Sequence, residues 1–450
     1  LTLLIVIFVL SINIILIYLS YYFLKKHIKI FSPIYILPFL ITSIEYFRSL
    51  GFYGSAWNSL SYSQVDYLLI SQNIEYTGIF GLTFWIILIN VSILQLFNNR
   101  NKKNIILLAV FFIIPWLSGL LIQYSYHDNY SNLNIKVVQP NIPLYEKRKN
   151  IMGSIDKLIE LSNRTNNDSI SLIIWPESSI SRKFIKDLKY NKNTSKAMNN
   201  FLYSNNFSII AGLDLQDKNR RFNSAVLLKS DSLINFYHKQ RLVPHVEHTP
   251  IIFDKLGLNI IPMANFDIGK KLSLFSVNNI NFASMICIES VFPNPTREFV
   301  QDGAEFIVYI VNDAWYPGNP QLEQHARRSI YRSIEHRKSV IRCANTGITM
   351  IVNPYGNITD KLEFNKEGVI EANIITKKAK EENINADVFG PLAFDNSISK
   401  KSAAIKKIKN EVAGSADILL VPNVESGNAL VKMMIYFMGA CAAGVVLGGK

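Results

Sequence analysis

Three side chains with complementary chemistry follow apolar, strand-like runs of the sequence. The carboxylate of Glu177 lies in the segment IWPES, the ammonium group of Lys239 in YHKQRLVP, and the thiol of Cys287 in MICIES. A base, a positive charge and a nucleophile are the components of an acyl-transfer site. Because all three follow a strand-like run, we expect them to meet at one edge of a sheet structure.

The chemistry of such a set follows from the thiol. A free cysteine has a pKa near ~8.5, so it is mostly protonated at neutral pH. A neighbouring carboxylate can accept the thiol proton during attack on a carbonyl, and a buried ammonium group can stabilise the resulting oxyanion. Each residue also has an ordinary interpretation: Cys287 as an inert core residue, Glu177 as a turn carboxylate and Lys239 as a surface lysine.

Other catalytic patterns fit less well. The sequence contains no G-x-S-x-G motif of a serine hydrolase. His245 and His248 flank Glu247, but this spacing does not match the H-E-x-x-H zinc motif, so we expect no metal. Cys343 lies in an apolar run and is expected in the core. The three cysteines imply no disulfide framework.

The middle of the chain alternates strand-like and helix-like segments. Strands are predicted at residues 135–139, 171–175, 208–211, 225–228, 233–237, 282–288, 306–311 and 349–352. Helices are predicted at residues 149–163, 194–204, 295–301 and 321–338. This alternation predicts an α/β architecture of stacked sheets with outer helices.

The first 124 residues predict a membrane module. Four apolar segments, at residues 1–24, 31–50, 79–97 and 105–123, are candidate transmembrane helices. Glu45 and Arg48 are three residues apart and would share a helix face, either as a functional pair or as a pair reaching the membrane surface. Since the chain begins at Leu1 and not at Met, we expect its start to be truncated.

Basic residues predict the orientation of these helices. The segment between the first two spans carries Lys25, Lys26 and Lys29, the one between the last two carries Arg100, Lys102 and Lys103, and residues 51–78 carry no Lys or Arg. Basic loops remain in the cytoplasm, so the rest of the chain should emerge on the outer, periplasmic face of a bacterial inner membrane. The net charge of +13 fits either an anionic lipid surface or a solvated lysine-rich surface. Because aromatic residues do not interleave with basic clusters, we expect no nucleic-acid partner.

The segments around the three side chains resemble the Glu-Lys-Cys triad of the nitrilase superfamily. With the multi-span N-terminal region they narrow the resemblance to apolipoprotein N-acyltransferases over about residues 1–376. The further motifs that carry it are EYFR at residues 45–48, RLVP leading to Glu247, NDAWY at residues 312–316 and NTGIT at residues 345–349. The resemblance implies a four-layer αββα sandwich for residues 125–376.

The resemblance also implies residue roles. Cys287 would take an acyl group from a phospholipid as a thioester, with Glu177 as general base and Lys239 as oxyanion stabiliser. The acceptor would be the α-amino group of a diacylglyceryl-cysteine on an apolipoprotein, and no cofactor is implied. Supporting or substrate-binding positions match Glu247, which would position the lysine, and Glu289, Asn312 and Trp315.

The end of the chain has a different character. Segments at residues 389–396, 412–422 and 425–428 resemble part of the phosphate acetyl/butyryltransferases, so we expect residues 377–450 to be a fusion or an assembly artefact without activity of their own. Residues 429–449 are apolar enough for a closing span, but the resemblance favours a soluble helix followed by a strand. Three alternatives to the acyltransferase remain: a membrane-tethered amidase in which water replaces the amine, a phosphate acyltransferase, and a non-catalytic membrane scaffold.

Overall fold

A computed structural model describes most of the chain up to residue 377. The described residues are 2–27, 32–51, 54, 56–125, 130–143, 151–164, 169–180, 200–202, 207–217, 219–229, 232–244, 246–248, 265–314 and 320–377, with 400 and 404. The chain separates into two compact units, residues 1–380 and 381–450. The predictions for residues 389–449, for Trp315 and His245, and for most of the helix at 194–204 lie outside the described residues.

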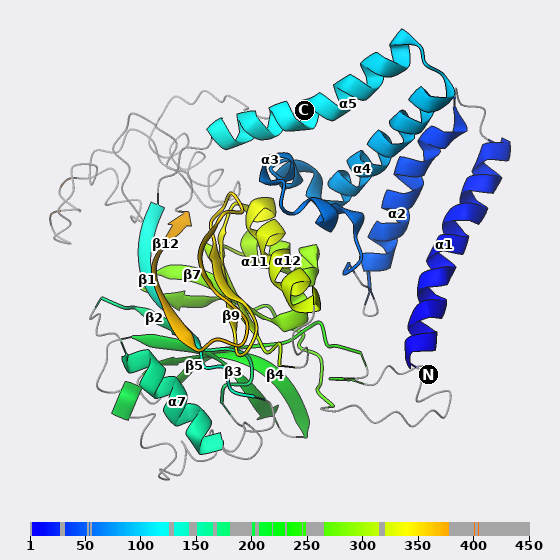
Figure 1. Cartoon of the computed structure of the whole chain (residues 1–450). Coiled ribbons are helices and arrows are strands. Elements are labelled where there is room, and N and C mark those ends of the chain that lie inside the picture. The colour runs from blue at the N-terminus through cyan, green and yellow to red at the C-terminus, as the bar shows by residue number, and fades with distance from the viewer. Residues whose placement is uncertain are drawn as a thin grey trace, which may run out of the picture. The chain divides into compact units, whose positions relative to one another are not determined.

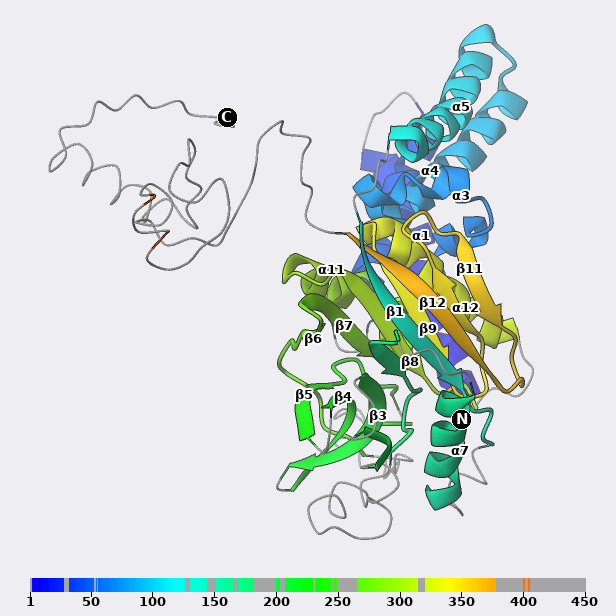
Figure 2. The ribbon, with the colours of Figure 1, turned by 90° about the vertical axis from the view of Figure 1, so that its left-hand side faces the viewer.

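Two six-stranded sheets form the centre of the first unit (Figures 1 and 2). The first sheet has the order β12-β1-β2-β3-β4-β5. Its strands are β1 (Tyr130–Gln139), β2 (Leu172–Ile174), β3 (Ser208–Asp217), β4 (Arg220–Lys229), β5 (Ser232–His238) and β12 (Gly368–Lys377). Strands β1, β2 and β3 are parallel, whereas β12 pairs antiparallel with β1 over ten residue pairs, Tyr130 with Lys377 to Gln139 with Gly368.

The second sheet has the order β11-β10-β9-β8-β7-β6, in which β7, β8 and β9 are parallel. Its strands are β6 (Phe275–Val277), β7 (Ile280–Ile286), β8 (Phe306–Val311), β9 (Ser339–Ala344), β10 (Thr349–Val352) and β11 (Ile358–Leu362). Every residue of β8, β9 and β10 is buried, as expected for strands covered on both faces.

Helices cover the outer faces of both sheets. Helix α7 (Ile151–Asn163) packs on the first sheet, through a core that includes Leu158, Trp175 and Val226. Helices α11 (Pro293–Gln301) and α12 (Pro320–His336) lie over the second sheet, as Figure 1 shows. Apolar side chains of both sheets share one core between them. The predicted four-layer αββα sandwich is therefore confirmed for this part of the chain.

The N-terminal region is helical, but it differs from the predicted set of four spans. Its long helices are α1 (Thr2–His27), α4 (Ile74–Asn98) and α5 (Lys102–Ser125). The shorter elements are η1 (Pro33–Ile36), α2 (Leu37–Ser49), η2 (Leu60–Gln64) and α3 (Leu68–Ser71). Among the described residues, two helices are long and apolar enough to cross a membrane, Ile74–Asn98 and Lys102–Tyr124.

The second predicted span is not one continuous helix. Residues 33–36 form a 3-10 turn, and α2 then has 13 residues. At 1.5 Å per residue, 13 helical residues reach only ~20 Å, short of the ~30 Å hydrocarbon core. The third predicted span is extended toward its start, where α4 bends at Gly78, whose φ of 63° lies in the left-handed region. The count of four spans stays a prediction.

Glu45 and Arg48 do not act as the expected pair. The buried Glu45 carboxylate accepts hydrogen bonds from the Ser59 hydroxyl (2.7 Å), the Thr83 hydroxyl (2.8 Å) and the Leu60 amide (3.0 Å). The Nε and Nη2 atoms of Arg48 have no partner among the described residues. Glu45 therefore fixes the loop before α3 to α4, a structural role that the spacing of the two charges did not indicate.

Helix α12 and the residue that follows it, Arg337, join the N-terminal region to the sandwich. The Tyr331 hydroxyl donates to the Ser61 carbonyl (2.7 Å), and Arg337 Nε lies 2.8 Å from Glu75 Oε2. Ile79, at the bend of α4, donates its amide to Glu335 Oε1 (3.2 Å). These contacts place the loop of residues 56–66 directly beside the catalytic half of the chain.

Candidate active site

Glu177, Lys239 and Cys287 each lie at the end of a strand. Glu177 follows β2 by three residues, Lys239 directly follows β5, and Cys287 directly follows β7. The first two therefore come from one sheet and the third from the other. The placement at strand ends, inferred from the apolar runs, agrees with the structure.

The lysine is held between two carboxylates. Lys239 is 1% exposed, and its Nζ atom lies 2.9 Å from the Glu247 carboxylate and 3.5 Å from Glu177 Oε1. Burial alone lowers the pKa of Lys239, but Glu247 and Glu177 outweigh this effect and raise it above its usual value. The amine is therefore an ammonium ion at every pH at which an enzyme works.

Asn223, a residue that the sequence patterns did not single out, fixes these carboxylates. Its Nδ2 atom donates to Glu177 Oε1 (2.7 Å) and to Glu247 Oε1 (2.9 Å). The Asn312 amide donates to Glu177 Oε2 (2.8 Å), so the predicted supporting residue Asn312 does contact the base, through its backbone. The Glu177 carboxylate is thus oriented from both oxygens.

Cys287 begins a 3-10 turn and does not end a strand as predicted. Strand β7 stops at Ile286, and Cys287 has a φ of 52°, in the left-handed region that non-glycine residues rarely adopt. The Glu289 carboxylate causes the turn by accepting the Ile286 amide hydrogen (2.8 Å). Such backbone strain is typical of functional sites.

Loss of solvation and the nearby Glu177 charge raise the pKa of the Cys287 thiol well above its usual value, although Lys239 partly opposes this. The thiol is therefore protonated at rest. It can act as a nucleophile only if a base removes its proton, and Glu177 is the carboxylate whose charge raises the pKa of the thiol most. The arrangement favours proton transfer during attack over a pre-formed thiolate.

Glu289, predicted as a supporting or substrate-binding residue, contacts the segments that carry the lysine and the cysteine. It is fully buried, and besides Ile286 it accepts hydrogen bonds from the Tyr237 hydroxyl (2.7 Å) and the amides of Gln240 (2.8 Å) and Arg241 (3.1 Å). One carboxylate thus ties the segment that carries Lys239 to the turn that carries Cys287.

A second buried network lies beneath the cysteine turn. His325 Nε2 is 3.2 Å from the Cys287 carbonyl oxygen, and its Nδ1 atom is 3.0 Å from Asp313 Oδ1. Arg342 Nη2 lies 2.6 Å from Asp313 Oδ2 and 3.2 Å from His325 Nδ1. Burial and the Arg342 charge lower the pKa of His325, so the ring carries a single N–H, which its tautomer directs either to the Asp313 carboxylate or to the Cys287 carbonyl.

These groups also bear on a possible metal site. Ligand atoms of Cys287, Asp313 and His325 lie within 4.8 Å of one another. Burial raises the pKa of Asp313, but Arg342 and His325 outweigh it and lower the pKa below its usual value. The carboxylate is thus ionised and already neutralised by a guanidinium group, which disfavours a cation. The absence of a metal from the reaction stays a prediction.

Two glycines allow the backbone to approach the site. A side chain at Gly212 would overlap the backbone of Glu177 and Ser178, and one at Gly269 would overlap the His238 carbonyl group beside Lys239. Cys343 lies elsewhere: its thiol is buried between the sheets, 3.4 Å from the carbonyl oxygens of Val138 and Ile174. The expectation that Cys343 is a core residue is confirmed.

Comparison with known proteins supports the family suggested by these residues. The carbon-nitrogen hydrolase family matches residues 134–381, more than half of the chain. The chain belongs to the carbon-nitrogen hydrolase family. Residues 1–92 match the apolipoprotein N-acyltransferase N-terminal domain, and residues 360–450 match phosphate acetyl/butaryl transferase. Both resemblances stated from the sequence are thus confirmed.

Individual relatives are similar to this chain over most of its length. The chain is 27% identical to the apolipoprotein N-acyltransferase of Thermotoga maritima over 342 residues, which are 75% of this chain and 64% of that protein. It is 25% identical to the Chlorobaculum tepidum apolipoprotein N-acyltransferase over 392 residues, 79% of this chain and 73% of that protein. The chain therefore spans less than two thirds of the first relative.

A solved structure is also similar. Saccharomyces cerevisiae Nit3, a member of branch 10 of the nitrilase superfamily, is 17% identical with a TM-score of 0.39, covering 56% of this chain and 92% of that chain. This score is too low to carry an inference. The fold assignment rests on the strand order and on the family match.

Proposed function

We propose that this carbon-nitrogen hydrolase family member is an apolipoprotein N-acyltransferase. It would transfer a fatty acyl group from a membrane phospholipid, through a thioester on Cys287, to the α-amino group of an N-terminal diacylglyceryl-cysteine. The observation that carries the proposal is the buried Glu177–Lys239–Glu247 cluster, held by Asn223 beside the strained Cys287 turn.

In the first half-reaction, Cys287 Sγ attacks the acyl ester carbonyl while Glu177 accepts the thiol proton. Glu247 and Glu177 occupy two directions around the Lys239 ammonium group, which has three N–H donors, so one donor remains for the oxyanion. Collapse of the tetrahedral adduct breaks the ester C–O bond. The departing alkoxide takes the proton from Glu177 and leaves as a lysophospholipid.

In the second half-reaction, the acceptor amine attacks the thioester carbonyl. Glu177 accepts the proton that the amine loses, and Lys239 again stabilises the oxyanion. The C–S bond then breaks, the proton returns to the sulfur, and an N-acylated product leaves. Asn312 supports this cycle by holding Glu177 through its amide, while Trp315 remains a proposed substrate contact from the resemblance alone.

Membrane attachment is part of the proposal. Helix α5 exposes large apolar side chains along its length, including Ile106, Leu117 and Leu121, which are 61%, 55% and 68% exposed. Gln95 Nε2 donates to Ser32 Oγ (2.5 Å), so the two basic connections predicted to be cytoplasmic lie at the same end of the helices. We propose four spans in a bacterial inner membrane, with the sandwich on the periplasmic face.

We propose three divisions of the chain: a membrane module at residues 1–124, a catalytic domain at 125–376 and a phosphate acyltransferase-like segment at 377–450. The last agrees with the separation of residues 381–450 as a compact unit of its own. We propose that this segment contributes no activity. The proposed partners are therefore a phospholipid donor and a diacylglyceryl-apolipoprotein acceptor, without a cofactor or nucleic acid.

A membrane-tethered amidase is the second candidate, because the family match alone fits a C–N hydrolase. One experiment separates the two. The full chain in phospholipid vesicles receives phospholipid with a labelled acyl chain, and hydroxylamine-sensitive label on the protein is measured. Cys287→Ala should abolish the label, and Cys343→Ala is the matched control that should keep it.

A diacylglyceryl-cysteine peptide is then added. Label that moves to the peptide supports the acyltransferase, whereas release only as free fatty acid supports hydrolysis. Label that persists in Cys287→Ala would show that the nucleophile is wrong. Absence of label in the parent would contradict the proposed donor.

A further inference from the structure

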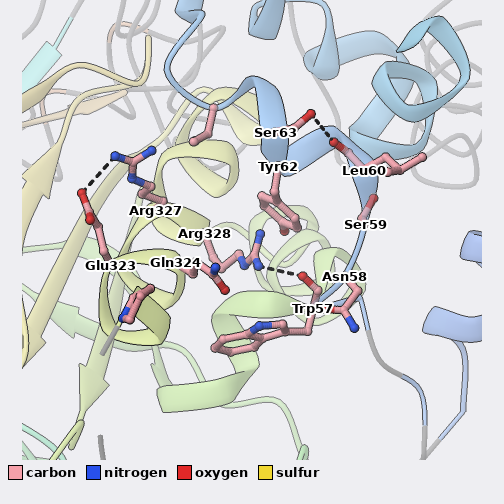
Figure 3. Close-up of a pocket in the computed structure, with 12 residues that line it drawn as sticks. Trp57, Asn58, Ser59, Leu60, Tyr62, Ser63, Glu323, Gln324, Arg327 and Arg328 are labelled. Atoms are coloured by element: carbon pink, nitrogen blue, oxygen red, sulfur yellow. Dashed lines mark hydrogen bonds and ion pairs between the residues drawn. The ribbon is translucent and has the colours of Figure 1, made fainter. Parts of the chain in front are cut away.

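A cavity separate from the triad lies between the loop of residues 57–65 and the start of α12. Its volume is about 570 Å³, within the range of small-molecule sites. Figure 3 shows Arg328 reaching between Trp57 and Tyr62 at its centre, with Glu323 and Arg327 at its side.

Arg328 is a buried cation with incomplete bonding. It is 4% exposed, and its guanidinium carbon lies 3.5 Å from the centre of the Tyr62 ring. Nη2 donates to the Trp57 carbonyl (2.7 Å), but Nε is buried without a partner among the described residues. A buried charge that is not fully bonded costs free energy, unless a ligand completes its contacts.

The neighbouring carboxylates are already engaged. Glu323 lines the cavity, but its Oε1 atom is 2.9 Å from Arg327 Nη2, and Asp66 Oδ2 is 2.7 Å from Arg327 Nη1. Loss of solvation lowers the pKa of Arg328, and Arg332 lowers it further. Arg327 is therefore neutralised by its partners, whereas the charge of Arg328 is not.

Tyr62, which also lines the cavity, carries a second unsatisfied donor. The Tyr62 hydroxyl is buried and has no hydrogen-bond partner among the described residues. A phenolic O–H and a guanidinium N–H together can bind the oxygens of one oxyanion. The remaining wall is mixed. Leu60, Val65, Pro320 and Trp57 supply apolar and aromatic surface, and the polar residues are Asn58, Ser59, Ser63 and Gln324.

We infer that this cavity binds the phosphodiester group of a glycerophospholipid, with Arg328 and Tyr62 as the contacts to the phosphate oxygens. The inference rests on the proposed function, because it assigns a head-group site to the acyl donor. A single phosphate ion would leave most of a 570 Å³ cavity unfilled. The aromatic and aliphatic walls suit the glycerol and the start of an acyl chain.

The position of the cavity agrees with this assignment. The Trp57 ring centre is 5.6 Å from that of His325, whose Nε2 atom is 3.2 Å from the Cys287 carbonyl oxygen. Trp57 also packs in a cluster with Ile288, the residue after the nucleophile. In a glycerophospholipid only the glycerol separates the phosphate from the reactive ester. One lipid can therefore contact both the cavity, through its phosphate, and Cys287, through its ester.

The first test compares two acyl donors with the full chain. Thioester formation is measured with a labelled phospholipid and with the diacylglycerol of the same acyl chains, which lacks the phosphate. For Arg328→Gln we expect kcat/KM to fall about tenfold to hundredfold with the phospholipid, through KM, because a hydrogen bond to a charged group is lost. With the diacylglycerol, kcat/KM of Arg328→Gln and of the parent should agree within about twofold.

Tyr62→Phe removes one hydroxyl and keeps the ring, so it tests the site even if Arg328→Gln does not fold. We expect a smaller loss, about threefold to tenfold, again confined to the phospholipid. Arg297→Gln, an exposed arginine on α11, is the matched control for loss of a positive charge. Equal losses with both donors, or none with the phospholipid, would overturn the inference.

The second test measures binding without catalysis. The full chain carrying Cys287→Ala is titrated with glycerophosphoethanolamine and with inorganic phosphate, and tryptophan fluorescence is followed, with Trp57→Phe to assign the signal. Binding of glycerophosphoethanolamine that is lost in Arg328→Gln supports the site, even if the parent forms no thioester and the proposed function fails. Equal affinity for inorganic phosphate would overturn the lipid assignment, and binding of neither would overturn the site.

Discussion

Replacement of Asn223 by Asp would reverse the hydrogen bonding at the centre of the candidate site. In the parent, Asn223 Nδ2 donates to both Glu177 (2.7 Å) and Glu247 (2.9 Å). An aspartate has the same size but offers only acceptor oxygens when ionised. Asn223→Asp would therefore lose two bonds and place a third carboxylate beside two others.

The expected magnitude follows from these two contacts. Each hydrogen bond to a charged group is worth about 1.5–3 kcal/mol, so the pair represents about 3–6 kcal/mol. Both bonds exist before and during the reaction, so only part of this energy should enter the barrier. If about 3 kcal/mol does, thioester formation slows about 10²-fold. Asn223→Ala, which adds no charge, should slow it less, by about tenfold.

The assay is rapid-quench measurement of hydroxylamine-sensitive label on Cys287 from labelled phospholipid in vesicles. Asn281→Asp, an exposed residue of β7, is the matched control and should react like the parent. If Asn223→Asp has the thermal stability of the parent and a rate of thioester formation within about threefold of it, the two hydrogen bonds of Asn223 do not control this rate.

Three other predictions concern the cysteines and the network below them. Glu177→Gln removes a charge that raises the pKa of Cys287, so this pKa should fall and the thiolate fraction at pH 8 should increase severalfold. Iodoacetamide should then alkylate Cys287 faster than in the parent, although thioester formation is lost. Slower alkylation would contradict the assigned effect of the Glu177 charge. Cys343→Ala should lower the free energy of unfolding by about 1 kcal/mol and keep acyl transfer, as measured by thermal melting and labelling. The Cys343 side chain packs in the core, and its hydrogen bonds are to backbone carbonyl oxygens away from the triad. His325→Phe should reduce the thioester rate about tenfold with an unchanged KM, because the polar contacts of the ring nitrogens with the Cys287 carbonyl and Asp313 are lost. His325→Gln should restore part of the rate, and failure of rescue would indicate a packing role.

The β-rich apolar runs located most of the buried strands but not all of their limits. Strand β3 continues to Asp217 and β4 begins at Arg220, beyond the predicted ranges 208–211 and 225–228, and the buried strand β9 was missed. Predicted and observed limits agree for β8 at residues 306–311 and for β10 at residues 349–352. Strand β12 was missed, since its first part is only partly buried and carries no continuous apolar run. Its place depends on pairing with β1, some 240 residues away in the sequence, and local patterns carry no such information.

The site was predictable only where a functional group follows a strand. Asn223 lies inside β4, two residues before the predicted strand, and nothing in its neighbours marks it as a clamp. His325 lies in a helix whose limits were predicted within about two residues, but its contact with Cys287 depends on how α12 packs. Arg328 illustrates the same limit: its burial results from a loop that lies some 265 residues earlier in the chain.

The active site depends on the packing of two sheets, since neither sheet carries the whole set. Glu177 and Lys239 extend from the first sheet and Cys287 from the second, and the Glu289 carboxylate joins the Lys239 segment to the Cys287 turn by hydrogen bonds from both. On the opposite side of Cys287, His325 joins the turn to α12, and α12 in turn contacts the N-terminal loop that forms the Arg328 cavity. The Cys287 thiol therefore lies between the Glu177 carboxylate, fixed by one sheet, and the cavity that we propose for the phospholipid head group, bounded by a helix. The proposed transfer of an acyl chain from a phospholipid uses both, whereas hydrolysis of a small amide would need only the first.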